Sequence, residues 1–316
     1  MTNISPESPE ERRKHPEGKE TRTGHRLIAR AWIVTKRVAI GVYSEGFVHA
    51  GNLAYLSILT LFPFIIVAAA VTRLLGHSGG GLQTFTALLQ TMPPDVADVL
   101  SKPINDVLAA RSGNLLWLGA VVGLWTTGSF IETIRDIIRR AYGVDYTRPF
   151  WEYRLWSMGI IFGSVVLLLI AFSVSIILSG VQQFILAIFP RADELVSLLT
   201  LLRVVPGLVL FGSLYLLFVS LTPKRYRSMK CHKWPGPAFV ALWWVATTAL
   251  LPVILSNLGS YDLTYGSLAG VMIALIFFFV IGLGLVIGAH LNAALAETPK
   301  STVEENVVLK REQGDG

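Results

Sequence analysis

Charged side chains inside otherwise apolar stretches are the residues of this sequence best able to do chemistry. Glu132 ends an uncharged run that begins at Leu115, and Arg135 and Asp136 follow on the same helical face. An ionisable group at the centre of a membrane helix costs about 2.5 to 3.5 kcal/mol on insertion scales. Glu132 is therefore a candidate for a polar pathway or a headgroup contact, with Arg135 as its ion-pair partner. The alternative is a helix end at which Glu132 reaches cytoplasmic water, because three arginines follow within eight residues.

Polar residues also stand near the ends of two further apolar runs. Asn52 and Asn257 lie in apolar surroundings, where an amide needs a hydrogen-bond partner that a neighbouring helix can supply. Asp262 precedes the last run, and an aspartate in a short external loop is ordinarily solvated, which is the alternative to a pathway role. The last run ends near His290, so the bilayer separates Asp262 from His290 and the two cannot form one site. The candidate pathway residues are Asn52, Tyr55, Glu132, Arg135, Asp136, Asn257, Tyr261, Asp262, Tyr265, His290 and Asn292.

The residue pattern argues against catalysis and metal binding. The six histidines are scattered and form no His-x-His or His-Glu-x-x-His motif, and Cys231 with His232 offers too few ligands for a metal ion. The sequence has no Walker loop, Gly-x-Ser-x-Gly elbow or Rossmann fingerprint. We therefore expect no enzyme activity, no catalytic residue, no metal and no cofactor.

The composition is that of a membrane protein. Of its 316 residues, 53% are hydrophobic and only 15% are charged, whereas a soluble domain carries about 25% charged residues. A net charge of +6 would suggest nucleic acid in a soluble protein. In a membrane protein, basic residues in loops set the topology and contact anionic lipid headgroups. We expect membrane lipids as partners and no nucleic acid.

The apolar runs predict an all-α polytopic membrane protein with six transmembrane helices. About 20 apolar residues suffice to cross a bilayer as a helix. Charge-poor runs of this kind occur at about residues 50–75, 115–132, 157–188, 198–221, 238–258 and 268–289. Pro63 should bend the first of these helices. Gly-x-x-x-Gly spacings, as at Gly284 and Gly288, predict either close packing within the bundle or a dimer face.

The remaining segments flank this membrane domain, which we place at residues 26–298. The polar composition predicts a disordered cytoplasmic tail at 1–25, and a second cytoplasmic tail follows at 299–316. Residues from 26 to 42 show helical periodicity, which predicts an amphipathic helix in the membrane interface or, as an alternative, a helix packed on the bundle. Residues 82–110 predict short amphipathic helices in the first external loop.

The distribution of basic residues predicts the orientation. Of the 27 lysines and arginines, 22 fall in the N-terminal region, the second and fourth connections and the C-terminal tail. These four regions share one side only if the number of spans is even. Because basic loops stay in the cytoplasm, we expect a multi-pass protein of the bacterial inner (plasma) membrane with both termini cytoplasmic.

Three segments resemble the YihY/BrkB family of bacterial inner-membrane proteins. They are FVHAGNLAYLSILTLFPFII, LWTTGSFIETIRDIIRRAYGV and YGSLAGVMIALIFFFVIGLGLVIGAHLNA, and the likeness covers residues 26 to 296. The resemblance implies a six-helix inner-membrane protein, with members linked to serum resistance and to export of envelope lipid or lipopolysaccharide. The family was formerly labelled ribonuclease BN, a trimmer of transfer RNA. The lack of a metal-binding acidic or histidine cluster argues against carrying that label over.

The sequence departs from the family at one position. Relatives commonly end the last span with Gly-Ala-Glu-Leu/Ile-Asn, and this chain has His290 in place of the glutamate. If that acid couples protons or cations in relatives, the coupling is in doubt here or shifts to a group that titrates near neutrality. The alternative is a polar residue at the cytoplasmic end of a helix.

Two functions follow as hypotheses. The first is a transporter or translocator of a lipid, a lipid headgroup or a small solute in envelope homeostasis, along the few polar groups of the bundle. The second is a non-transporting membrane scaffold that docks envelope-assembly proteins through its amphipathic external helices and basic cytoplasmic loops. The substrate, the ion coupling and the oligomeric state stay open at this point.

Overall fold

Every regular element of the chain that the structure describes is helical. The computed structural model describes residues 7–14, 27–74, 96–98, 101, 113–144, 151–152, 154–155, 157–159, 163, 205–227, 233–257 and 269–296. The helices are α1 (Pro9–Lys14), α2 (Leu27–Leu74), α5 (Gly113–Tyr142), α8 (Val205–Leu221), α9 (Lys224–Arg227), α10 (Pro235–Asn257) and α12 (Ala269–Leu295). The predicted all-α class is confirmed for these residues.

Two of these helices are long and apolar enough to cross a membrane. They cover Pro235–Ile254 in α10 and Ala269–Leu295 in α12. At about 1.5 Å per residue, each matches the roughly 30 Å of a hydrocarbon core. α8 contains a shorter apolar stretch at Leu210–Leu221. Most of the predicted third span and most of residues 82–110 lie outside the described residues, so the number of spans and the orientation stay predictions.

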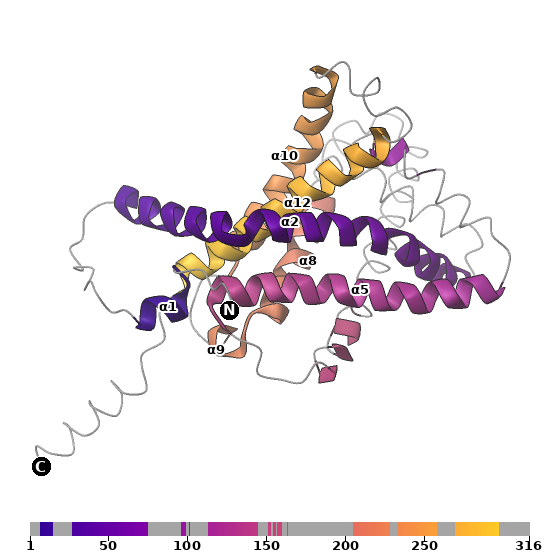
Figure 1. Ribbon diagram of the computed structural model, residues 1–316, viewed down its shortest axis with the longest axis horizontal. Helices are drawn as coiled ribbons and strands as arrows, with labels where there is room; N and C mark the ends of the chain where they lie inside the picture. The colour runs from indigo at the N-terminus through magenta and orange to yellow at the C-terminus, as the bar shows by residue number, and fades with distance from the viewer. Residues whose placement is uncertain are drawn as a thin grey trace, which may run out of the picture.

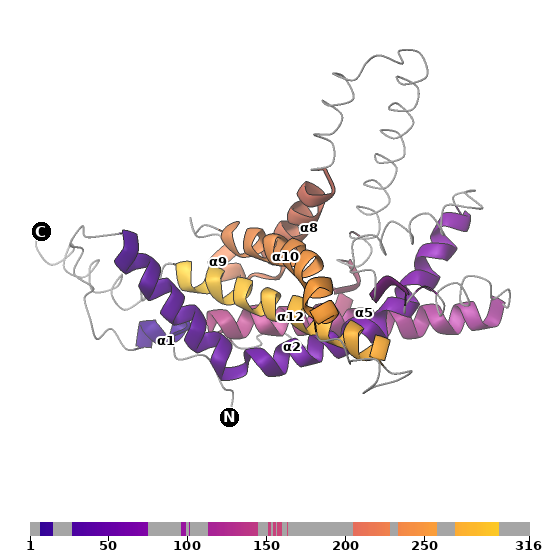
Figure 2. The ribbon, with the colours of Figure 1, turned by 90° about the horizontal axis from the view of Figure 1, so that it is seen from above.

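α2 joins two segments that the sequence suggested were separate. The expected amphipathic helix at 26–42 and the first span at 50–75 form one continuous helix of 48 residues. It contacts both α5 and α12, and it is visibly bent along its length in Figure 2. The segment expected at 26–42 is therefore continuous with the first predicted span, and its placement in the membrane interface or on the bundle stays a prediction.

α12 is the helix against which α2 and α10 pack most extensively, and Figure 1 shows it crossing both of them. The buried core combines apolar residues from all the long helices, among them Leu53, Ile134, Phe218, Val240 and Val286. The indole Nε1 of Trp243 on α10 donates a hydrogen bond to the Val280 carbonyl of α12 at 2.8 Å.

Small residues allow α10 and α12 to approach each other closely. A Cβ placed at Gly236 would lie 2.5 Å from the backbone oxygen of Gly288, and one at Gly284 would lie 2.1 Å from the Trp243 ring. The Gly284 and Gly288 spacing therefore serves packing within this chain. The outer face of α10 carries exposed apolar side chains, Leu242, Val245, Leu250, Val253 and Ile254. Such a surface suits contact with lipid.

Candidate functional site

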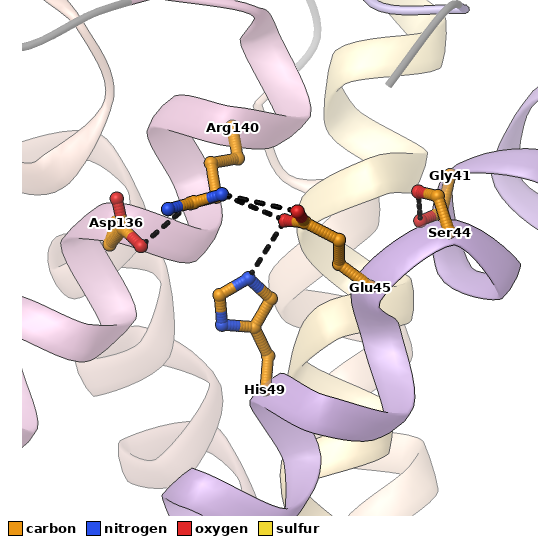
Figure 3. A network of polar contacts seen from close by, with 6 residues as sticks. All are labelled: Gly41, Ser44, Glu45, His49, Asp136 and Arg140. Atoms are coloured by element: carbon orange, nitrogen blue, oxygen red, sulfur yellow. Dashed lines mark hydrogen bonds and ion pairs between the residues drawn. The ribbon is translucent and has the colours of Figure 1, made fainter. Parts of the chain in front are cut away.

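A network of charged side chains joins α2 to α5. Arg140 of α5 donates from Nη1 to both carboxylate oxygens of Glu45 on α2, at 2.9 and 3.3 Å. Its Nε donates to the Asp136 carboxylate at 2.8 Å, one helical turn earlier on α5. Figure 3 shows the guanidinium held between these two carboxylates. The Arg140 and Glu45 side chains are 35% and 22% exposed, so water screens this contact in part.

Two histidines extend the network. His49 lies one turn after Glu45 on α2, with its Nε2 3.3 Å from the Glu45 carboxylate. His290 of α12 lines the same small hollow, and the absence of a side chain at Gly41 makes room for its ring, since a Cβ there would lie 2.3 Å from Nδ1. The hollow is lined by Gly41, Ser44, Glu45, His49, Ile137, Arg140 and His290, so α2, α5 and α12 all contribute.

The charged network offers hydrogen-bond donors and acceptors to a small polar group. It places a carboxylate, a guanidinium, a hydroxyl and two imidazoles around one hollow. The cavity volume is about 10 Å³, which is room for a single water molecule. Within the described part of the chain, no group of three or more His, Cys, Asp or Glu residues is arranged to hold a metal ion.

Glu132 forms a second ion pair, about two helical turns before Arg140 on α5. Its partner is Arg154, whose side chain is only 3% exposed and whose Nη1 lies 3.2 Å from the Glu132 carboxylate. Arg154 also donates to the Trp125 carbonyl and, at 3.3 Å, to Ser129 Oγ. Its guanidinium lies 4.2 Å from the centre of the Trp125 ring, a cation–π contact. Gly128 makes room, because a Cβ there would lie 2.9 Å from the guanidinium carbon.

This arrangement differs from what local helical spacing suggested for Glu132. The spacing favoured Arg135 as the partner. In the structure, the Glu132 carboxylate instead pairs with Arg154, which lies beyond the end of α5. Arg135 is itself buried on α5. Glu132 is therefore held by an ion pair within the protein.

Asn292 has a structural role. Its side chain is 2% exposed, its Oδ1 accepts the backbone N–H of Gly236 at 2.7 Å, and its Nδ2 donates to the Lys233 carbonyl at 3.0 Å. Gly236 lies in the first turn of α10, where backbone N–H groups have no partner within the helix. Asn292 thus caps α10 from the end of α12, outside the network.

The remaining candidate residues lie either away from the hollow or outside the described side chains. Asn52 and Tyr55 lie exposed on α2, away from the hollow. Asn257 is the last residue of α10, and its side chain lies outside the described residues, as do Tyr261, Asp262 and Tyr265.

Of the predicted residues whose side chains the structure describes, Asp136 and His290 belong to the network, in contact with or beside Arg140. Sequence reasoning missed Glu45, His49 and Arg140 as site residues. The available signal was the spacing of Glu45 and His49, one helical turn apart just before an apolar run.

The comparisons with known proteins agree with a membrane protein. A "Putative ribonuclease-like protein YfkH" of Bacillus subtilis is 26% identical over 260 residues, covering 81% of this chain and 92% of the relative. A UPF0761 membrane protein of Pseudoalteromonas translucida is 24% identical over 82% of this chain and 85% of its own. One of Aliivibrio salmonicida is 22% identical over 84% and 87%. No solved structure matches. The family model "Virulence factor BrkB" matches residues 43–311, so the chain belongs to the BrkB family of membrane proteins.

Proposed function

We propose that this protein is an inner-membrane translocator that binds a lipid headgroup or a small polar solute at the network of Glu45, His49, Asp136, Arg140 and His290. The observation that carries the proposal is the charged hollow where α2, α5 and α12 meet. Ionisable residues within membrane bundles are costly and commonly line the paths of substrates and ions.

The charge of the hollow favours a polar headgroup over acyl chains. The hollow has room for about one water molecule, so a headgroup binds here only when α2, α5 and α12 move apart. Glu45 can accept hydrogen bonds from a cationic group, and Arg140 can donate to an anionic one. A lipid could keep its chains in the bilayer while its headgroup enters between the helices.

Orientation and localisation are part of the same proposal. The 22 basic residues assigned to one side support cytoplasmic termini and six spans. Reporter fusions at the C-terminus and within residues 76–114 should report opposite sides of the inner membrane. Finding both reporters on one side would refute the six-span topology.

Liposomes test the translocation directly. We expect purified protein to speed the movement of headgroup-labelled phospholipid between leaflets, measured by quenching of the outer label. Glu45→Gln should slow this movement about tenfold, the effect of losing one charge-assisted hydrogen bond. Asp98→Asn, at an exposed position away from the network, is the matched control and should keep the full rate.

The scaffold hypothesis predicts a different outcome from the same preparation. Protein-containing liposomes would then match empty ones for every labelled lipid and for small solutes, and the solubilised protein would co-purify with a stable envelope-assembly partner. That combination would overturn the translocator proposal.

The proposal also holds that the chain is not an enzyme. The ribonuclease-like name belongs to the relative YfkH. In the described residues, no clustered set of metal-binding side chains supports such chemistry. Incubating the purified protein with transfer RNA should leave the RNA intact, and trimming that Glu45→Gln or Glu132→Gln abolishes would contradict this part.

A further inference from the structure

A short helix in the N-terminal tail departs from the disorder expected for residues 1–25. α1 covers Pro9–Lys14, and Ser8 precedes it as N-cap. The Ser8 Oγ accepts the backbone N–H of Glu11 at 3.4 Å, and the Ser8 carbonyl accepts that of Arg12 at 3.0 Å. Serine at the N-cap, proline at the first position and glutamate at the third are typical of a helix start. This local motif explains why these residues are ordered.

Glu10 attaches α1 to α9. Its Oε1 accepts a hydrogen bond from the Tyr226 hydroxyl at 2.8 Å and lies 3.1 Å from Nη1 of Arg225. The Tyr226 ring is buried against Tyr142, with ring centres 4.9 Å apart. Burial and the hydrogen bond to Glu10 raise the pKa of Tyr226 well above its usual value, so the phenol stays protonated and donates.

Ser8 and Arg12 attach the same helix to the ends of α5 and α12. Ser8 is buried over Gly143, which follows α5 at a positive φ of 74°. A Cβ at Gly143 would lie 2.4 Å from Ser8 Oγ, so only glycine fits both the conformation and the contact. Arg12 Nη2 donates to the carbonyls of Ala293 and Ala296 at 3.4 Å each. Ala293 lies in the last turn of α12, and its carbonyl also accepts the backbone N–H of Ala296, which directly follows the helix.

The contacts of α1 lie close to the charged network. Gly143 follows Arg140 by three residues, and Ala293 follows His290 by three residues. On α2, Arg37 lies one turn before Gly41 and pairs with Glu7 at 3.6 Å. Figure 1 shows α1 beside the ends of α5 and α12 and near α9. Residues 7–12 therefore contact the C-terminal ends of α5 and α12, and they contact α2 one turn before the hollow.

We propose that α9 and the C-terminal ends of α5 and α12 form a docking surface for a serine-capped helix with an acidic first turn, which residues 7–14 of this chain occupy reversibly. A six-residue helix is not stable alone in water, so it folds on docking. Its attachment is mainly polar, and Arg225 is 45% exposed, so salt and competing charges can loosen it. Docking ties together the ends of the helices that carry the charged network.

Thiol labelling in the full-length chain tests the docking. In a Cys231→Ser background, Pro9→Cys places one thiol at a buried position of α1 and leaves the Ser8 cap and the contacts of Glu10 and Arg12 in place. We expect slow reaction with a maleimide in the otherwise unchanged chain and about tenfold faster reaction with Glu10→Gln, because a buried hydrogen bond and an ion pair are lost. High salt should also speed labelling. Glu17→Gln, in the same tail but outside residues 7–14, is the matched control and should not change the rate.

Exchanging the charges of Glu10 and Arg225 distinguishes a loss of docking from a general loss of stability. Arg225→Glu alone should speed labelling, and Glu10→Arg combined with Arg225→Glu should restore slow labelling, because the opposite charges again face each other. A synthetic peptide of residues 1–20 at millimolar concentration should compete with the tethered segment, whose effective concentration is about millimolar. A scrambled peptide should not compete.

Two outcomes would overturn the proposal. One is labelling of the Pro9→Cys thiol in the folded chain at the rate seen after denaturation. The other is an unchanged slow rate in both Glu10→Gln and Arg225→Glu, which would mean that residue 9 is buried without this docking. Neither outcome depends on whether the protein moves lipid, so the test stands apart from the translocator proposal.

Discussion

Two contact regions of α12 differ in how completely their polar groups are satisfied. At the interface with α10, glycine backbones nearly touch, and both ends of the Asn292 amide have a backbone partner. At the interface with α2 and α5, His290 faces a partly open hollow with Glu45, His49 and Arg140. The first region uses polar atoms to close a tight packing surface. The second region contains more ionisable side chains than close packing requires, which is typical of a functional site.

The largest effect should follow from a change in the tight interface. Gly236→Ala would place a Cβ 2.5 Å from the Gly288 carbonyl oxygen and 2.8 Å from the Asn292 side chain, and the Gly288 backbone cannot move away easily. Overpacking of this kind costs about 3 kcal/mol of stability. Thermal unfolding in detergent should show the loss. Gly51→Ala is the control, because nothing lies within 4 Å of its added Cβ and alanine favours the helix more than glycine does. An equal loss of stability in both variants would mean that close approach at Gly236 is not responsible.

Loss of the α10 cap should have the next largest effect. Asn292→Ala leaves the Gly236 N–H and the Lys233 carbonyl without their side-chain partner in a buried place. The expected loss is about 2 kcal/mol, the usual cost of stranded buried polar groups. Unfolding in detergent measures it, and lipid movement per folded molecule should stay near wild type. A selective loss of movement with normal stability would place Asn292 in the functional site instead.

The Glu132–Arg154 ion pair should have an intermediate effect on stability, smaller than that of the tight α10–α12 interface and larger than that of the charged network. Glu132→Gln keeps the shape but removes the charge that faces the buried Arg154 guanidinium. Because Arg154 keeps its bonds to Trp125 and Ser129, we expect a loss of about 1.5 kcal/mol and a folded protein. Lipid movement should fall as well if this pair lines the same path. Unchanged movement in liposomes would assign the pair to structure alone.

The smallest effect on stability should come from the charged network. Glu45→Gln should cost less than about 1 kcal/mol, since its partners remain partly exposed to water. Its effect on lipid movement should nevertheless exceed that of Asn292→Ala. Comparing the two variants in unfolding and liposome assays tests the difference between the two regions. A stability loss for Glu45→Gln as large as that for Gly236→Ala would remove the distinction.

The positions of the apolar helices could be read from the sequence with good accuracy. The fifth span was expected at 238–258 and α10 covers Pro235–Asn257, while the sixth was expected at 268–289 and α12 covers Ala269–Leu295. Hydrophobicity over about 20 residues is a local property, so the sequence reports it directly. The continuity of α2 was harder to predict, because polar residues such as Glu45 and His49 interrupt its apolar pattern.

The charged network could be predicted only in part. Asp136 and His290 stood out as polar residues near apolar runs, but Glu45 and Arg140 are 95 positions apart and meet only because α2 packs on α5. Local spacing likewise favoured Arg135 for Glu132, while Arg154 reaches the carboxylate from beyond the end of α5. Side-chain partners across helices depend on packing, which periodicity within one helix does not describe.

The sequence by itself determined that this is an all-helical membrane protein of the BrkB family, because hydrophobic length, charge depletion and the three family segments are properties of contiguous residues. Only the tertiary structure decided which polar residues act together. It assigned Asn292 to a cap, Glu132 to Arg154 and His290 to the network with Glu45 and Arg140. The physical reason is that hydrogen bonds and ion pairs act over a few ångströms, and the groups concerned become neighbours only after the helices pack.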